Sequence, residues 1–313
     1  MFRTSRVAFS ALLSLTVALA AMLQSPNACR AGTTGIIVPA YFYPGTGGPG
    51  GSGNGWAAMA AAASQVPITA IFNPDSGPLP GPADPNYVTA LTNLETAGGK
   101  SVAYVYTGDG SVPLVTVESQ ISTYITQYGS LINGFFLDAM NVIPSELSYY
   151  QSIDSFIKTL SASYDVIGNP GQPFLNGVTP AQYLATANTF DLFEGSDASF
   201  SSYPYGLNWF ESDASSQFSN IVYDAPTVTA MQADITKAVG LDAGYVYVTD
   251  QTLPNPYAQL PSYWDQEVAA VATLNAKVPA AVPQPTPLAS GLVLGGLIAL
   301  TAMRRGGLLH LAC

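Results

Sequence analysis

Gly134-Phe135-Phe136-Leu137-Asp138 opens the stretch of sequence that decides the fold we expect. Residues 145–163 follow it, and then comes Asp165-Val166-Ile167-Gly168-Asn169-Pro170-Gly171. The first and last segments are short apolar runs that end in polar residues, as buried strands do. The middle segment has apolar side chains at helical spacing, with Pro144 just before it. A strand, a helix and a second strand in this order predict a parallel sheet that is covered by helices.

The same alternation of apolar runs and helical patterns continues through residues 32–281. We expect eight strands, at 35–42, 68–74, 101–107, 134–138, 165–171, 189–194, 220–224 and 243–250. We expect helices at 56–65, 84–97, 116–128, 145–163, 180–188, 205–219, 227–239 and 264–274. Eight strand–helix pairs in about 250 residues predict one (β/α)8 TIM barrel of the α/β class, as a single domain. An open doubly wound sheet is the alternative, but the glycine-rich loop 45–55 lacks its usual Gly-x-Gly-x-x-Gly turn. We interpret that loop as a flexible active-site loop.

The composition of residues 32–281 removes most catalytic chemistries. This region contains no histidine, cysteine or arginine, since the one histidine is His310, the cysteines are Cys29 and Cys313, and the arginines lie near the termini. Nucleophiles that need an imidazole, and zinc sites built from His and Cys, are therefore excluded there. Carboxylate chemistry remains, assisted by Tyr, Asn, Ser and Thr, and we expect no cofactor and no metal.

The region is strongly acidic. All twenty acidic residues lie in it against four lysines, which gives a formal charge of −16. Such a charge argues against nucleic acid and anionic membranes as partners. It suits a neutral or cationic partner, and a partly deacetylated amino-sugar polymer would be cationic. The alternative is that the acidity only keeps an exported protein in solution.

Polar residues follow the predicted strands, where a TIM barrel holds its active site. They are Tyr41, Tyr43, Asn73, Tyr106, Thr107, Asp138, Asn169, Glu194, Asp224 and Asp250. Converging carboxylates raise one another's pKa, so that one of them stays protonated as a general acid, and glycoside hydrolysis requires such a pair. Two alternatives remain open. Acids at strand ends often cap the next helix, as Asp224 and Asp250 could, and oxygen-only sites can bind calcium or magnesium.

The two ends of the chain predict export. Residues 1–31 are typical of a signal peptide, with Arg3 and Arg6 before the apolar run 7–22. A buried N-terminal helix is the alternative. Residues 282–313 resemble the Pro-Glu-Pro sorting signals of exopolysaccharide-producing bacteria, which exosortase-type machinery recognises. The proline-rich motif 282–287 precedes sixteen mostly apolar residues and then Arg304-Arg305. Gln284 stands where that signal usually has Glu, and a plain membrane anchor, transient or permanent, is the alternative.

Several segments of residues 32–281 form a set whose order and spacing are informative. They are Val38-Pro39-Ala40-Tyr41-Phe42-Tyr43-Pro44 with Trp56, Asn73-Pro74-Asp75-Ser76-Gly77-Pro78, Asp84-Pro85-Asn86-Tyr87, Tyr104-Val105-Tyr106-Thr107, Gly134-Phe135-Phe136-Leu137-Asp138, Asn169-Pro170-Gly171, Phe193-Glu194 and Tyr247-Val248-Thr249-Asp250. Together these segments resemble the spherulin 4 family of secreted TIM-barrel proteins. The resemblance implies a glycoside hydrolase for galactosamine-containing polysaccharides of biofilm matrices. It also implies that Asp138 and Glu194 match acidic positions of the family's active site. This chain has Ala139 where the family usually has a second, adjacent acid.

The sequence therefore predicts an exported, endo-acting glycoside hydrolase for an amino-sugar exopolysaccharide, at the cell surface or outside the cell. Asp138 and Glu194 are the expected catalytic pair. Tyr41, Tyr43, Asn73, Tyr106, Asn169, Asp224 and Asp250 are the expected substrate-binding residues. We expect a monomer whose partners are the polysaccharide and the export and sorting machinery. The alternatives are a non-catalytic carbohydrate-binding or matrix protein, which Ala139 favours, and a surface-layer structural protein.

Overall fold

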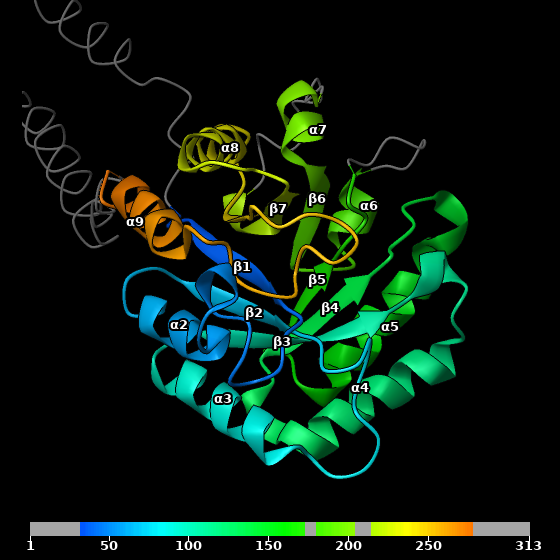
Figure 1. Cartoon of the computed structure of the whole chain (residues 1–313). Helices are drawn as coiled ribbons and strands as arrows, with labels where there is room; N and C mark the ends of the chain where they lie inside the picture. Colours follow the sequence, from blue (N-terminus) through cyan, green and yellow to red (C-terminus); the bar gives the residue numbers. More distant parts are fainter. Residues whose placement is uncertain (1–31, 173–179, 204–213, 278–313) are drawn as a thin grey trace, which may run out of the picture. The chain divides into compact units, whose positions relative to one another are not determined.

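The computed structural model describes residues 32–172, 180–203 and 214–277 (Figure 1). Within these residues the strands pair in sequence order, and the last pairs with the first, so that they close into a parallel barrel. The strands are β1 (Gly35–Ala40), β2 (Ile68–Phe72), β3 (Lys100–Tyr106), β4 (Gly134–Asp138), β5 (Asp165–Gly168), β6 (Thr189–Ser196), β7 (Phe218–Tyr223) and β8 (Tyr245–Val248). The predicted (β/α)8 barrel is confirmed.

The strands are buried on both faces. Every residue of β1 and β2 is buried, and β4 is buried up to Asp138, where its last side chain reaches partly into solvent. Continuous apolar runs of this kind are typical of parallel strands that lie between a packed interior and a layer of helices. In the strand register Tyr106 lies opposite Asp138, so the polar ends of β3 and β4 lie on the same rim of the barrel.

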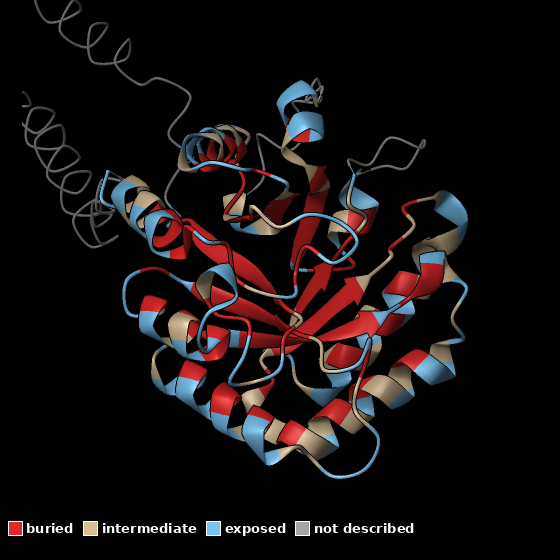
Figure 2. Cartoon of the chain, viewed as in Figure 1, coloured by how far each residue is buried: buried red, intermediate tan, exposed pale blue. Residues whose placement is uncertain are grey.

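Helices surround the barrel, and their inner sides are buried while their outer sides are exposed (Figure 2). They are α2 (Gly55–Ala62), α3 (Pro85–Thr96), α4 (Leu114–Tyr128), α5 (Leu147–Leu160), α6 (Pro180–Leu184), α7 (Asp197–Ser202), α8 (Val228–Gly240) and α9 (Trp264–Asn275). Short 3-10 turns lie at Pro49–Gly51, Gly108–Gly110, Gly129–Leu131, Pro144–Glu146 and Ser215–Gln217. In α5 the buried residues Tyr150, Ile153 and Ile157 recur every three or four positions and form the stripe that packs on the barrel.

Side-chain caps explain where the first helices begin. The Oδ1 atom of Asn54 accepts hydrogen bonds from the backbone N–H groups of Trp56 and Ala57 at 3.1 and 3.3 Å. Asp84 caps α3 in the same way, and Pro85 occupies the first helical position, where no N–H donor is needed. Backbone bonds to Leu260 hold the glycine-rich loop 45–55, which does not line the cavity described below.

The helix that we expected at 205–219 is the main error of the sequence analysis. Residues 204–213 lie outside the described part of the chain, and Phe218 and Ser219 belong to β7. The helix after β6 is instead α7, which begins at once because Ser196 caps it. Phe218 is buried opposite Phe190, and Ser219 bonds a buried carboxylate, so barrel packing overrides the helical pattern there.

All the described residues fall in one compact unit. Within them, no helix is both long enough and apolar enough to cross a membrane. The expected signal peptide at 1–31 and the sorting segment at 282–313 lie outside the described residues.

Candidate active site

A cavity of about 570 Å³ lies at the carboxyl ends of the barrel strands. It is bounded by the ends of β1 and β4 to β7 and by the loop between β8 and α9. The lining residues are Tyr41, Asp138, Ala139, Asn169, Pro170, Gly171, Glu194, Tyr223, Leu253, Pro254, Asn255, Pro256 and Tyr257. TIM-barrel enzymes place their reacting residues on this face, so the cavity is the candidate active site.

Asn169 connects the two acids of the cavity. Its side-chain Nδ2 donates to Oδ1 of Asp138 at 2.9 Å and to Oε2 of Glu194 at 2.6 Å. The residue follows β5 directly, and its backbone bonds both Leu137 and Met140, which fixes the amide between β4 and β6. Asn169 is only 4% exposed. Two carboxylates from different strands are therefore held against one rigid donor.

The surroundings of Glu194 raise the pKa of its carboxyl group. Burial raises its pKa above the usual range, and the nearby charge of Asp138 acts in the same direction. Hydrogen bonds from Tyr257 and Asn169 stabilise the ionised form and limit this rise. The Tyr257 hydroxyl donates to Oε1 at 2.7 Å. A carboxyl group with a raised pKa keeps its proton nearer neutral pH, as a general acid must.

Asp138 accepts from a second donor besides Asn169. The hydroxyl of Tyr104, on β3, donates to its Oδ2 atom at 2.6 Å. Burial and the charge of Asp138 raise the pKa of Tyr104, so its hydroxyl remains a donor. Both oxygens of Asp138 are thus held in place by neutral groups, and no lysine lines the described cavity. Hydrogen bonds therefore orient this carboxyl group, and no lysine of the cavity lining pairs with it.

Three tyrosine rings pack together beside the acids, and two of them, Tyr41 and Tyr257, line the cavity as an aromatic wall. The ring of Tyr41 packs edge-on against Tyr104 at 5.7 Å and against Tyr257 at 5.5 Å between centroids. Edge-to-face packing of this kind holds aromatic rings in defined orientations. The wall therefore fixes both hydroxyls that bond the acids and also presents an aromatic surface to a bound ligand.

A third acid, Asp191, lies deeper in the barrel. It is fully buried, and its Oδ1 accepts from the Ser219 hydroxyl at 2.9 Å. In a regular strand Asp191 and Glu194 would face opposite sides, because side chains alternate. The register of β6 on β7 shifts between Asp191 and Phe193, which allows both acids to turn inward. Burial, followed by the charge of Glu194, raises the pKa of Asp191 well above its usual range, which favours its protonated form.

Ala139 lines the cavity directly after Asp138. Its backbone has a φ of 51°, in the left-handed region that non-glycine residues rarely adopt. Its carbonyl oxygen accepts from the Asp109 N–H and the Thr107 hydroxyl, both at 2.8 Å, which holds this conformation. The resemblance implied a second acid beside Asp138, and at this position the chain presents only a methyl group to the cavity.

The structure brings together four of the nine predicted site residues. Tyr41, Asp138, Asn169 and Glu194 line the cavity, whereas Tyr43, Asn73, Tyr106, Asp224 and Asp250 do not. Asn73 accepts from the Gly77 N–H and organises a turn, and Tyr43 bonds Asp84 and Asn86 on the exposed rim. Tyr106 is 46% exposed.

The two acids predicted at the ends of β7 and β8 lie in the loops that follow. β7 ends at Tyr223, and Asp224 is exposed with a φ of 59°. β8 ends at Val248, and Asp250 accepts from the Ser262 N–H and from the Gln251 side chain. Asp250 therefore organises the β8–α9 loop, whereas the sequence had predicted that it binds the substrate.

Sequence reasoning missed Tyr104, Tyr257 and Asp191. Tyr104 stands two residues before the selected Tyr106, so alternation alone would have offered both. Tyr257 lies in a long loop without a periodic signal. Asp191 could not be predicted as a neighbour of the site without knowing that the register of β6 on β7 is irregular. As for a metal, no group of three or more His, Cys, Asp or Glu side chains in the described residues is placed to hold an ion.

Comparison with known proteins adds to this geometry. The family model described as Spherulation-specific family 4 matches residues 35–271. Spherulin-4 from Physarum polycephalum is 33% identical over 250 residues, which cover 77% of this chain and 70% of that protein.

The crystal structure of Aspergillus clavatus Sph3 in complex with GalNAc matches with a TM-score of 0.63 at 22% identity, covering 77% of this chain and 98% of that one. A chitinase from Rhizomucor miehei matches with a TM-score of 0.48 at 10% identity, covering 76% of this chain and 99% of that one. The likeness to Sph3 supports the barrel fold.

Proposed function

This protein belongs to the spherulin 4 family, and we propose that it is an exported, endo-acting glycoside hydrolase, which cleaves internal bonds of a galactosamine-type exopolysaccharide. The observation that carries this proposal is the single Asn169 amide that donates to both Asp138 and Glu194. A pair of carboxyl groups facing one cavity is the minimal machinery for glycoside hydrolysis.

Glu194 serves as the general acid in this proposal. Because its pKa is raised, the carboxyl group of Glu194 keeps a proton nearer neutral pH and can donate it to the departing glycosidic oxygen. Asn169 and Tyr257 hold its two oxygens, so the proton is delivered from a fixed position. After the bond breaks, the same two donors stabilise the carboxylate that is left.

Asp138 serves as the second carboxylate and faces the sugar carbon. The bonds of 2.9 and 2.6 Å to the same Nδ2 atom limit how far apart the nearest oxygens of the two acids can lie. Their sum is smaller than the ~6.5 Å separation that leaves room for an attacking water in inverting enzymes. The geometry supports retention of the anomeric configuration, with Asp138 as the nucleophile.

The cavity and the family both support the proposed substrate class. Tyrosine rings and uncompensated carboxylates suit a sugar with an amino or acetamido group. The solved Sph3 structure contains GalNAc, which supports a galactosamine polymer as the substrate. Export to the cell surface, with the signal at 1–31 and the sorting segment at 282–313, is part of the same proposal. Intact-mass measurement of the protein from its producing cell would test both cleavages.

A non-catalytic carbohydrate-binding protein is the second candidate, and Ala139 is the observation that favours it. Incubating the full-length protein with galactosamine-containing exopolysaccharide separates the two functions. An endo-acting hydrolase lowers the polymer's mass early in size-exclusion chromatography and releases oligosaccharides. Co-elution of the protein with polymer of unchanged size would contradict hydrolysis and support binding.

A further inference from the structure

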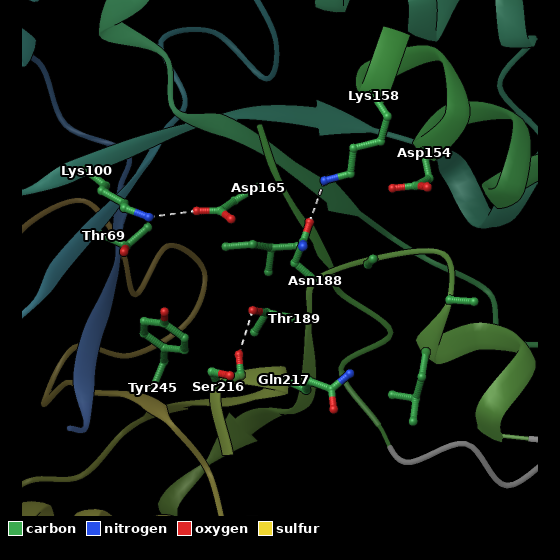
Figure 3. Close-up of a pocket in the computed structure, with 14 residues that line it drawn as sticks. Thr69, Lys100, Asp154, Lys158, Asp165, Asn188, Thr189, Ser216, Gln217 and Tyr245 are labelled. Atoms are coloured by element: carbon green, nitrogen blue, oxygen red, sulfur yellow. Dashed lines mark hydrogen bonds and ion pairs between the residues drawn. The ribbon is translucent and has the colours of Figure 1, made fainter. Parts of the chain in front are cut away.

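A second cavity, of about 540 Å³, lies at the opposite end of the barrel. Figure 3 shows the residues that line it. Thr69, Lys100, Asp165, Thr189 and Tyr245 line it, each at or next to the first residue of its strand. In a parallel barrel the amino ends of the strands form one rim and the carboxyl ends the other. This basal pocket is therefore separate from the candidate active site, and its volume is that of an ordinary ligand site.

The charges of the basal pocket are balanced. Lys100 forms an ion pair with Asp165 at 3.0 Å. Lys158, on α5, donates to Asn188 at 2.8 Å, and Asp154 lies one turn before it (Figure 3). Two of the four lysines of residues 32–281 thus gather at one pocket of a strongly acidic region. The candidate active site, by contrast, has acids in its lining and no lysine.

Several polar groups of the basal pocket have no partner in the described part of the chain. Thr69 lines the pocket and is only 8% exposed, and its hydroxyl has no hydrogen-bond partner among the described residues. The side chains of Tyr245 and Gln217 make none either within the described ranges, and both line the same cavity. Hydroxyl and amide groups can both donate and accept, so together they suit a ligand that does both.

We propose that the basal pocket is a second carbohydrate site, which binds an uncharged hexosamine unit such as an N-acetylated one. The hydroxyls and amide match the alternating donors and acceptors of a sugar, and the Tyr245 ring supplies a stacking face. Because the two ammonium groups and the two carboxylates of the lining balance, the pocket has no net charge that would attract a cationic amino sugar or an anionic one. The site would hold polymer independently of any catalysis.

The lysines themselves allow a direct test. Reductive ¹³C-methylation of the full-length protein labels the amino terminus and only four lysines, of which Lys100 and Lys158 line the basal pocket. Lys→Arg variants assign the signals. Titration with N-acetylgalactosamine should shift the Lys100 and Lys158 signals in a saturable way, and leave those of Lys237 and Lys277 in place. Galactosamine, which is cationic, should bind at least about tenfold more weakly, an energy near one lost hydrogen bond.

Two variants make the result specific. Thr69→Val combined with Tyr245→Phe removes two free hydroxyls at nearly constant volume and should weaken binding by about tenfold or more. Glu194→Gln should leave the lysine shifts unchanged, because it lies at the other rim. Absence of the two shifts up to the solubility limit of the sugar would overturn the proposal, and so would shifts that persist undiminished in the double variant. Neither outcome depends on whether the protein hydrolyses its polymer.

Discussion

The hydroxyl of Tyr257 donates a 2.7 Å hydrogen bond to Oε1 of Glu194, across 63 positions of sequence. Tyr257 comes from the β8–α9 loop and is 6% exposed. The same ring packs edge-on against Tyr41. A loop residue therefore sets the protonation of the acid on β6, through a donor that favours the ionised form.

Replacing Tyr257 by Phe should raise the pKa of Glu194. If Glu194 acts as the acid, activity is lost as the pH rises through its pKa, so the alkaline limb of the kcat/KM profile should move upward. A hydrogen bond to a charged group is worth ~1.5–3 kcal/mol, which corresponds to a shift of about one pH unit or more. Tyr245→Phe, at the opposite rim, is the matched control and should not move the limb. A downward shift, or none, would contradict the assignment of Glu194 as the acid.

Replacing Asn169 by Ala should lower kcat by about a hundredfold, because both acids lose the donor that aligns them. The backbone bonds of Asn169 remain, so the fold should persist. Asn73→Ala provides the comparison. Asn73 also follows a strand but caps a turn outside the cavity, and kcat should change by less than about threefold. Equal losses in the two variants would show that Asn169 has no particular role in the site.

Replacing Ala139 by Gly should stabilise the protein, since glycine adopts a φ of 51° without strain. The expected gain in unfolding free energy is about 0.5–1 kcal/mol, because the added freedom of the unfolded chain offsets part of the relief. Chemical denaturation measures it. Ala103→Gly, in the buried and regular β3, should instead destabilise the protein. A destabilised Ala139→Gly variant would mean that the methyl group contributes packing that outweighs the strain.

These residues also show what the sequence could and could not predict. The barrel could be predicted from the apolar runs of the strands and from the helical spacing of apolar residues between them. The strand runs are continuous because each strand is buried on both faces. Asp138, Asn169 and Glu194 could be selected because they directly follow apolar residues. Tyr257 and Asp191 could not, since one depends on how a long loop folds back and the other on a one-residue shift within β6. Asp224 and Asp250 were misplaced because strand ends are set by pairing that the sequence does not display.

The buried Asp234, on α8, should make the stability of the folded protein decrease as the pH rises. Burial, followed by the charge of Asp197, raises the pKa of Asp234 to about 7. A folded-state pKa above the unfolded value means that stability is lost as the pH rises from the unfolded value to about 7. Wild-type protein should lose about 2–3 kcal/mol of unfolding free energy between pH 5 and pH 8 from this group. Asp234→Asn removes the titration, so its denaturation midpoint should vary less over this range. Identical pH dependence in the two proteins would contradict the raised pKa.

The central claim is that Asp138 and Glu194 form a working catalytic pair although Ala139 follows Asp138. The most direct test is the initial rate at which full-length protein releases reducing ends from galactosamine-containing exopolysaccharide, for wild type and for Glu194→Gln. We predict measurable release by wild type and a loss of ~10²–10⁴-fold in a folded Glu194→Gln variant, the usual worth of acid–base assistance. Residual activity above about a tenth of wild type, or no release by wild type at all, would contradict the claim.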